Sequence, residues 1–441
     1  MLDELRAAAA RQRQDRAVRA LVKQSRQLLS EQGETGGPVI VAAARELQET
    51  LGDVEYLGDA GLDAYFAWLA RELSPDPQAV LAAAQAYAAE PGAATLDALT
   101  RVAEPPRQEL FRRINRSPGG TSALLRLRRE LLKRLAAEPA LRAIDADLLH
   151  LMSSWFNPGF LRIQRVDWNS PAQLLERLIQ LEAVHAIDGW DDLRRRLQPD
   201  RRCFAFFHPQ LPGEPLVFVE VALLHEMPAA IAPLIDKAST PLASDRFRVA
   251  AFYSISNCEP GLRGVSLGNF LIKGVAEQLR RELPRLKTFC TLSPMPGFAA
   301  WLLGEPEFGA LPGLRGEAAA ALGEARKLLA RAAGGDMAEL QAASLHERLG
   351  EAGERALLQL AAAYLGHASP TPAGDPVARF HLDNGARLER LNLRANFSPR
   401  GLRQSFGMMV NYLYDLERVE ANHARFRRQD VVRSRAVAGL T

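Results

Sequence analysis

The sequence predicts an α+β protein: an all-helical first part, followed by a domain built on a mixed β-sheet with helical insertions. Residues 1–155 are dominated by Ala, Leu, Arg and Glu, which are strong helix formers. After Trp155, runs rich in Val and Phe alternate with helical stretches and Pro/Gly loops. With 441 residues, two to three domains are expected. We place the domain boundary after residue 155, which gives a helical domain over 1–155 and a mixed-sheet domain over 156–441.

Composition excludes several classes of protein. Apolar residues make up 47% and charged residues 24%, so disorder over the whole length is excluded. The net charge of +3 is too small to imply nucleic-acid binding, but it is compatible with an anionic ligand held at one site. Three cysteines without a C-x-x-C pair indicate a reducing compartment rather than a disulfide framework.

Targeting signals are also informative. No apolar run approaches the roughly 20 residues that span a bilayer, so no membrane is expected as a partner. The first 29 residues carry Asp3, Glu4 and Asp15 and lack the apolar core of a secretory signal, although their Arg- and Ala-rich pattern leaves a transit peptide as the alternative. We therefore expect a cytoplasmic protein.

The first part reads as six to eight short helices. Apolar residues recur near helical spacing at Leu57, Leu62, Tyr65, Leu69 and Leu73. Helix breakers separate the segments at 33–38, 74–77, 91–92, 105–106 and 118–120. His150 is the only histidine, so this part offers little chemistry and is expected to serve as a scaffold or in self-association.

The second part begins with a helical stretch and three strands. A helix is expected over 171–197, and a hairpin over 202–208 and 216–223 around a Pro/Gly loop. A third strand is expected over 247–255. The later elements are predicted as a helix over 266–283, a strand over 286–292, helix over 315–366, a hairpin of 377–382 and 388–393 around Asp383-Asn-Gly385, and a last helix over 402–420.

The loop before the helix at 266–283 is the first candidate site. Its glycines let backbone N–H groups approach a diphosphate, Arg263 adds a cation, and the helix N-terminus favours an anion. The alternative is a glycine-rich turn that merely starts a helix. Neither the dinucleotide fingerprint nor a P-loop is present. The candidate residues are Arg263, Gly264, Val265, Ser266, Leu267, Gly268 and Asn269.

Three further residues are candidates for chemistry. Ser293 follows a strand and is held on a rigid turn by two prolines, although a capping serine has the same signature and no G-x-S-x-G elbow is present. His381 precedes the predicted turn, where a structural histidine is the alternative, and no spacing indicates a metal. Tyr414 lies with a second tyrosine on the predicted last helix, a pattern also typical of packing.

Taken together, these segments resemble the malonyl-CoA decarboxylase family over about residues 155–420. Many separate blocks match in order, which makes the resemblance specific, whereas the first 150 residues match only as a helical region. The blocks are 155–160, 182–187, 202–209, 214–222, 252–256, 261–273, 291–298, 378–386 and 409–415.

The resemblance implies a helical domain for assembly into a homo-tetramer and a catalytic domain similar to the acetyltransferase superfamily (GNAT). It implies conversion of malonyl-CoA to acetyl-CoA and CO2 without a metal or organic cofactor. The family's catalytic serine and histidine correspond to Ser293 and His381, and further site residues correspond to Tyr414 and Ser254. The coenzyme-A loop corresponds to 263–269, where Ser266 replaces an acid found in some relatives.

A mechanism follows as a hypothesis. Loss of CO2 leaves an enolate, which needs hydrogen-bond donors on its oxygen and a proton for C2. His381 is expected to supply that proton, Ser293 to hold the malonyl carboxylate, and Tyr414 and Ser254 to orient the pair. Two alternatives are an acyl-CoA-dependent N-acyltransferase, which would need an amine acceptor, and a non-catalytic acyl-CoA-binding protein.

Overall fold

The computed structural model describes residues 2–30, 38–52, 54–265, 267–371 and 374–441. The chain forms two compact units. The first comprises Met1–Arg162 together with Phe207–Pro215 and Glu259–Ser266, and the second comprises the remaining residues. The boundary predicted after residue 155 stays a prediction. No helix in the described ranges is long and apolar enough to cross a membrane.

The first unit is helical, as the sequence predicts. Its helices within the described ranges are α1 (Leu2–Ser30), α2 (Pro38–Gly52), α3 (Val54–Glu72), α4 (Pro77–Ala89), α5 (Ala93–Ala103), α6 (Pro106–Asn115), α7 (Gly120–Arg134) and α8 (Arg142–Trp155). Prolines open α4 and α6, where a missing N–H costs nothing. The predicted breaker at 33–38 lies mostly outside the described residues.

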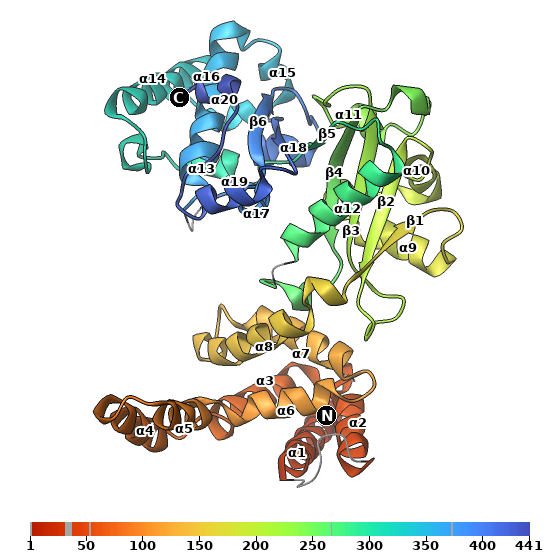
Figure 1. The fold of residues 1–441 in the computed structure, drawn as a ribbon, viewed down its shortest axis with the longest axis vertical. Coiled ribbons are helices and arrows are strands. Elements are labelled where there is room, and N and C mark those ends of the chain that lie inside the picture. The colour runs from red at the N-terminus through yellow and green to blue at the C-terminus, as the bar shows by residue number, and fades with distance from the viewer. Residues whose placement is uncertain (1, 31–37, 53, 266, 372–373) are drawn as a thin grey trace. The chain divides into compact units, whose positions relative to one another are not determined.

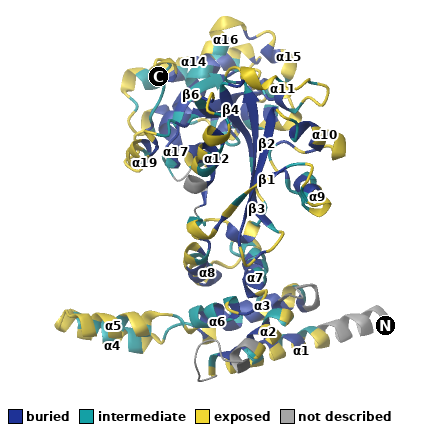
Figure 2. Cartoon of the chain, turned by 45° about the vertical axis from the view of Figure 1, so that its right-hand side comes forward, coloured by how far each residue is buried: buried dark blue, intermediate teal, exposed yellow. Residues whose placement is uncertain are grey.

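The apolar stripe of the first unit is its core. Leu57, Leu62, Tyr65, Leu69 and Leu73 are all buried, which confirms the helical spacing read from the sequence. Helices α4 and α5 differ, because neither contains a buried residue. Figure 2 shows this pair largely in the colour of exposed residues.

The second unit contains most of a seven-stranded sheet of order β1-β2-β3-β4-β5-β7-β6. Strand β4 pairs with β5 in parallel, whereas β3–β4, β5–β7 and β6–β7 are antiparallel. The strands are β1 (Arg162–Val166), β2 (Arg201–Phe207), β3 (Pro215–Leu224), β4 (Val249–Asn257), β5 (Thr288–Thr291), β6 (Arg387–Asn392) and β7 (Met409–Leu413). The predicted α+β class, with a helical first part and a mixed sheet with helical insertions, is confirmed.

Helices surround this sheet (Figure 1). They are α9 (Ala172–Leu181), α10 (Gly189–Arg196), α11 (Ala232–Ile235), α12 (Gly268–Glu282), α13 (Phe298–Leu303), α14 (Gly316–Ala332), α15 (Ala343–His346), α16 (Gly350–Ala363), α17 (Pro376–Asp383), α18 (Pro399–Ser405), α19 (Val419–Phe426) and α20 (Arg435–Ala438). A π-helical turn, η7 (Tyr364–Ala368), follows α16 directly.

The two parallel strands separate near the middle of the sheet. Their register runs from Val249 opposite Thr288 to Phe252 opposite Thr291, and Leu292 N donates to Phe252 O at 3.0 Å. Beyond this point β4 continues on β3, whereas Ser293 forms a bridge with Val410 of β7. The strand–loop–helix–strand unit expected from the sequence is therefore present, with α12 as its helix.

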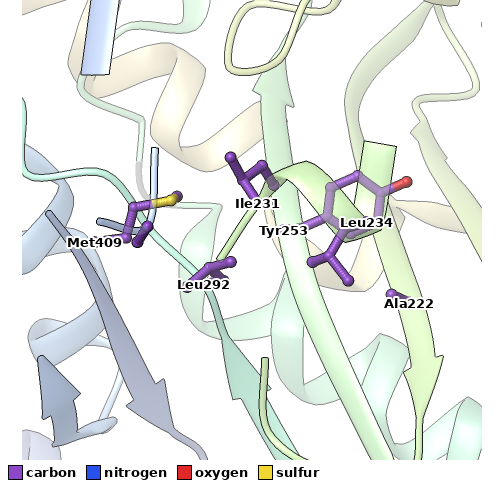
Figure 3. Close-up of a cluster of buried hydrophobic side chains, with 7 residues drawn as sticks. Ala222, Ile231, Leu234, Tyr253, Leu292 and Met409 are labelled. Atoms are coloured by element: carbon purple, nitrogen blue, oxygen red, sulfur yellow. The ribbon is translucent and has the colours of Figure 1, made fainter. Parts of the chain in front are cut away.

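Apolar packing holds the strands together on both sides of this separation. One cluster joins Ala222 of β3, Tyr253 of β4, Leu292 after β5 and Met409 of β7 with residues of the α11 segment (Figure 3). All four side chains are at most 2% exposed. Burial at this level stabilises each large apolar side chain by about 1.5–3 kcal/mol, so the strands that diverge are still fixed by a common core.

Two predicted elements are wrong. Residues 377–382 form helix α17 instead of a strand, because the Asp375 carboxylate accepts hydrogen bonds from Val377 N and Ala378 N and Pro376 occupies the first helical position. The partner of β6 is therefore β7, and the predicted hairpin around Asp383-Asn-Gly385 does not exist.

The second error concerns the last helix, predicted over 402–420. The structure has α18, then β7, then α19 in this region. Phe406 and Gly407 adopt positive φ angles of 53° and 75° and so end α18 after about two turns. Tyr412 consequently lies on a strand, and Tyr414 follows its end. Strand β1 was not predicted, and the helix expected over 171–197 is split into α9 and α10.

Candidate active site

Ser293 lies just past the end of β5, where β7 fixes its backbone. Its N–H donates to Val410 O at 2.8 Å, and its carbonyl accepts from Val410 N at 2.9 Å. The hydroxyl donates to Thr291 Oγ1 at 2.9 Å, and the side chain is buried. The residue therefore presents a hydroxyl with a defined direction, which a capping serine on a mobile turn would not do.

His381 lies on the last turn of α17 and faces Ser293. Its Nε2 is 3.0 Å from Ser293 Oγ, and its Nδ1 is 2.8 Å from Tyr414 Oη. The imidazole also stacks on Tyr412, with 4.7 Å between ring centroids and 28° between planes. The fold thus brings together a serine and a histidine that are 88 positions apart.

A single proton arrangement satisfies these contacts. When the Ser293 hydroxyl donates to Thr291, its oxygen accepts from Nε2–H of His381, and Nδ1 accepts from the Tyr414 hydroxyl. Burial lowers the pKa of His381 to about 3 and raises the pKa of Tyr414 well above its ordinary value. Without substrate the imidazole is therefore neutral at physiological pH.

Ser254 belongs to a different cluster. Its hydroxyl lies 2.7 Å from each carboxylate oxygen of Glu182 and 3.3 Å from Ser256 Oγ. Within the part of the chain that the structure describes, no hydrogen bond links its hydroxyl to Ser293 or His381. Glu182 Oε1 also accepts from the backbone N–H groups of Val184 and His185, so Ser254 fixes the segment between α9 and α10.

The predicted phosphate loop is only partly described. Arg263 is exposed, Gly264 has φ 88°, and α12 begins at Gly268. Arg263, Gly264 and Val265 belong to the first unit, and Leu267, Gly268 and Asn269 belong to the second. Ser266 lies outside the described residues, as do the details of the Asn269 side chain.

Two residues near the pair escaped the sequence reasoning. Asp375 caps α17, and its other carboxylate oxygen accepts from Gly297 N and Tyr364 Oη. The Asp-Pro dipeptide at 375–376 was the available signal for the cap. Nothing in the local sequence pointed to Tyr364, which directly follows α16 and begins the π-helical turn η7.

The Ser293–His381 pair can perform only a few kinds of chemistry. A neutral imidazole and a hydroxyl share one hydrogen bond in a buried setting, so together they can bind a carboxylate and move a proton. Across the residues that the structure describes, no group of three or more His, Cys, Asp or Glu side chains could hold a metal ion.

Comparisons with known proteins agree on one family. The protein-family model of the malonyl-CoA decarboxylase C-terminal domain matches residues 159–441, and the family model of the N-terminal domain matches residues 73–156. Among curated proteins, "Malonyl-CoA decarboxylase, mitochondrial" from Anser anser anser is 37% identical over 344 residues, covering 73% of this chain and 66% of that protein. The Rattus norvegicus protein of the same name is 37% identical over 348 residues, covering 74% and 69%.

Solved structures give the same result over nearly the whole chain. The crystal structure of malonyl-CoA decarboxylase from Rhodopseudomonas palustris is 46% identical with a TM-score of 0.82, covering 96% of this chain and 99% of that one. The structure from Agrobacterium vitis is 44% identical with a TM-score of 0.82 and the same coverage.

Proposed function

The chain belongs to the malonyl-CoA decarboxylase family, and from this premise we propose that it converts malonyl-CoA to acetyl-CoA and CO2 at Ser293 and His381. The observation that carries the proposal is the 3.0 Å contact between Ser293 Oγ and His381 Nε2. A buried serine–histidine pair whose second ring nitrogen is bonded by Tyr414 supports a catalytic site over a non-catalytic scaffold.

Decarboxylation places a negative charge on the thioester oxygen as the bond from C2 to the carboxylate breaks. That bond must stand perpendicular to the thioester plane, which is an orientation requirement met by holding the carboxylate. The Ser293 hydroxyl can supply one such contact when it turns from Thr291 to the substrate. This contact orients the bond that breaks, whereas donors on the thioester oxygen would favour the enolate over the ground state.

The proton for C2 is proposed to come from His381. Its imidazole is neutral in the free site, but a malonyl carboxylate arriving beside it favours the charged form. Substrate and proton therefore enter together, and the buried site keeps its net charge. The proton taken up lies on Nδ1; after CO2 leaves, Nε2–H protonates C2 of the enolate and the imidazole is left neutral with its proton on Nδ1. Exchange of that proton restores the Nε2–H form of the free site. The balance is malonyl-CoA plus one proton to acetyl-CoA plus CO2, and each step uses protein groups only.

Other residues receive supporting roles. Tyr414 holds Nδ1 of His381 and so keeps Nε2 directed at the substrate. For Ser254, the contacts favour fixing Glu182 over orienting the pair directly. We further propose that the backbone N–H groups and the cation of residues 263–269 bind the coenzyme A diphosphate.

Assembly is a separate proposal. The homo-tetramer suggested by the family resemblance would use the helical unit, and the α4–α5 pair supports this because Leu81 and Leu96 are 53% and 47% exposed. Light scattering of the purified chain, and of a Leu81→Lys variant, tests it: a monomeric wild type would contradict the proposal. The cytoplasmic location also stays a prediction.

The decisive experiment incubates the protein with malonyl-CoA alone and measures CO2. Turnover that is lost in Ser293→Ala and His381→Ala supports the decarboxylase. An N-acyltransferase would release no CO2 and would consume acyl-CoA only after an amine is added. A non-catalytic binder would bind coenzyme A but turn over nothing. His346→Ala is the matched control, since it removes another buried imidazole of the same unit that bonds only a backbone carbonyl in the described structure.

A further inference from the structure

Asp375 connects the segment that carries Ser293 to the helix that carries His381. Its side chain is only 1% exposed and accepts four hydrogen bonds. Oδ1 accepts from Val377 N at 2.9 Å and from Ala378 N at 3.0 Å, which completes the N-cap of α17. The cap therefore needs only one of the two carboxylate oxygens.

The second oxygen reaches two other segments. Oδ2 accepts from Gly297 N at 3.1 Å and from Tyr364 Oη at 3.2 Å. Gly297 is four residues after Ser293, and the two prolines between them restrict the backbone of this connection. A Cβ atom on Gly297 would collide with the Tyr364 hydroxyl, so glycine is what permits the three groups to meet.

Tyr364 directly follows α16 and is the first residue of the π-helical turn η7. Its backbone is still α-helical, and its carbonyl accepts from Ser369 N at 3.0 Å, so the end of α16 fixes where the tyrosine stands. The Tyr364 ring packs against Phe298 and Trp301, with ring centroids 5.6 Å and 5.1 Å away, so the hydroxyl is held from behind by the first helix after the Ser293 turn.

From these contacts we infer that Asp375 is a positioning residue for the proposed reaction: its Oδ2, with Tyr364, sets the separation between Ser293 Oγ and His381 Nε2. The inference rests on the function proposed above. Burial raises the pKa of Asp375 while its donors oppose the rise, as expected of a carboxylate held by hydrogen bonds rather than by a cation.

Asp375→Asn separates the two roles of the carboxylate. Asparagine caps helices about as well as aspartate, so Oδ1 can still serve α17. Its NH2 group loses the hydrogen bond from Gly297 N–H and can bond the Tyr364 hydroxyl only when that hydroxyl turns to accept, so the substitution weakens the connection between segments and spares the cap. Since a displacement of about 1 Å costs up to about 100-fold in rate, kcat should fall roughly 10- to 100-fold with KM changed less than about twofold.

Two controls distinguish positioning from a general loss of stability. Asp336→Asn changes another aspartate that caps a helical turn of the same unit through a backbone N–H, that of Ala338, and it should leave kcat within about twofold. Tyr364→Phe removes a single donor to Oδ2 and should lower kcat by about 3- to 10-fold, which tests the inference even where Asp375→Asn folds poorly.

The same substitution in a His381→Ala background provides the critical comparison. If Asp375 acts through the pair, Asp375→Asn costs less than about twofold there, because residues that act as a unit are not additive. An equal loss in both backgrounds, or unchanged kcat in Asp375→Asn and Tyr364→Phe, overturns the inference.

A structural readout keeps this result apart from the proposed function. If the wild type releases no CO2, the proposed function fails, and the crystal structure of Asp375→Asn still decides the inference. A Ser293 Oγ to His381 Nε2 distance that stays near 3.0 Å overturns the positioning role, whereas a separation beyond about 3.5 Å supports it.

Discussion

The pH dependence of turnover tests the proposed source of the proton, because burial lowers the pKa of His381 to about 3. At pH 7 only about one imidazole in 10⁴ is then protonated in the free protein. Two opposite charges about 4 Å apart attract by about 4 kcal/mol at an effective dielectric constant of about 20, so a bound malonyl carboxylate raises the protonated fraction about a thousandfold.

The free and the substrate-bound protein should therefore give two different pH profiles. The ratio kcat/KM reports the free protein, so it should fall about tenfold per pH unit from about pH 5 to 8, since each productive encounter takes up one proton. The value of kcat reports the bound state, so it should stay level up to about pH 6 and then fall. Below its ordinary pKa of 6.5, an unburied histidine would instead give a level kcat/KM.

The assay is CO2 release from malonyl-CoA across this pH range. The inhibition constant of free coenzyme A over the same range is the control, because it isolates the titration of the coenzyme's own phosphates. Calorimetry in two buffers of different ionisation enthalpy counts protons taken up with a malonyl-CoA analogue that cannot lose CO2. Near pH 5.5 the wild type should take up about one proton and His381→Ala none. A flat kcat/KM between about pH 6 and 8, with no proton uptake, would refute the reasoning.

Four further outcomes are expected. Ser293→Ala and His381→Ala should each lower kcat by about 10²- to 10⁴-fold, and the double variant no further than the worse single one; fully additive losses in the CO2 assay would show that the two act independently. Arg263→Ala should raise KM for malonyl-CoA about tenfold at nearly constant kcat, because a phosphate contact binds ground and transition states alike, and a change in kcat alone would contradict the diphosphate assignment. Tyr414→Phe should lower kcat up to about tenfold through loss of the 2.8 Å contact to Nδ1, with unchanged steady-state kinetics counting against that role. Gly385→Ala should lower the free energy of unfolding by about 2–4 kcal/mol in urea, since φ is 75° and a Cβ would meet a backbone carbonyl of α19; a wild-type midpoint would contradict this.

Sequence patterns predicted elements best where the local signal was long and one-sided. The helices of the first part and α12 have strong formers and clear breakers, so their order was predictable. The prediction of a helix over residues 409–413 was wrong, because a short apolar run fits a buried strand or a helix equally well. The prediction of a strand over residues 377–382 was wrong, because their apolar content suits a strand while the Asp375-Pro376 cap starts a helix.

The candidate site was likewise predictable only in part. The Ser293 turn, His381 and the glycine loop could be singled out from residue types and from blocks that resemble a known family. The contacts of Ser254 and Tyr412 could not be predicted, because one depends on the distant carboxylate of Glu182 and the other on the face of a strand that the sequence did not reveal.

By itself, the sequence determined the order of helical and mixed parts and, through blocks that resemble a known family, the residues that we propose as reacting groups, since these depend on residue types along the chain. Only the tertiary structure decided that β7 lies beside β5, and that α17 brings an imidazole 3.0 Å from a hydroxyl 88 residues away. It also decided the protonation state of His381, because desolvation comes from the segments packed around the ring and not from its neighbours in the chain.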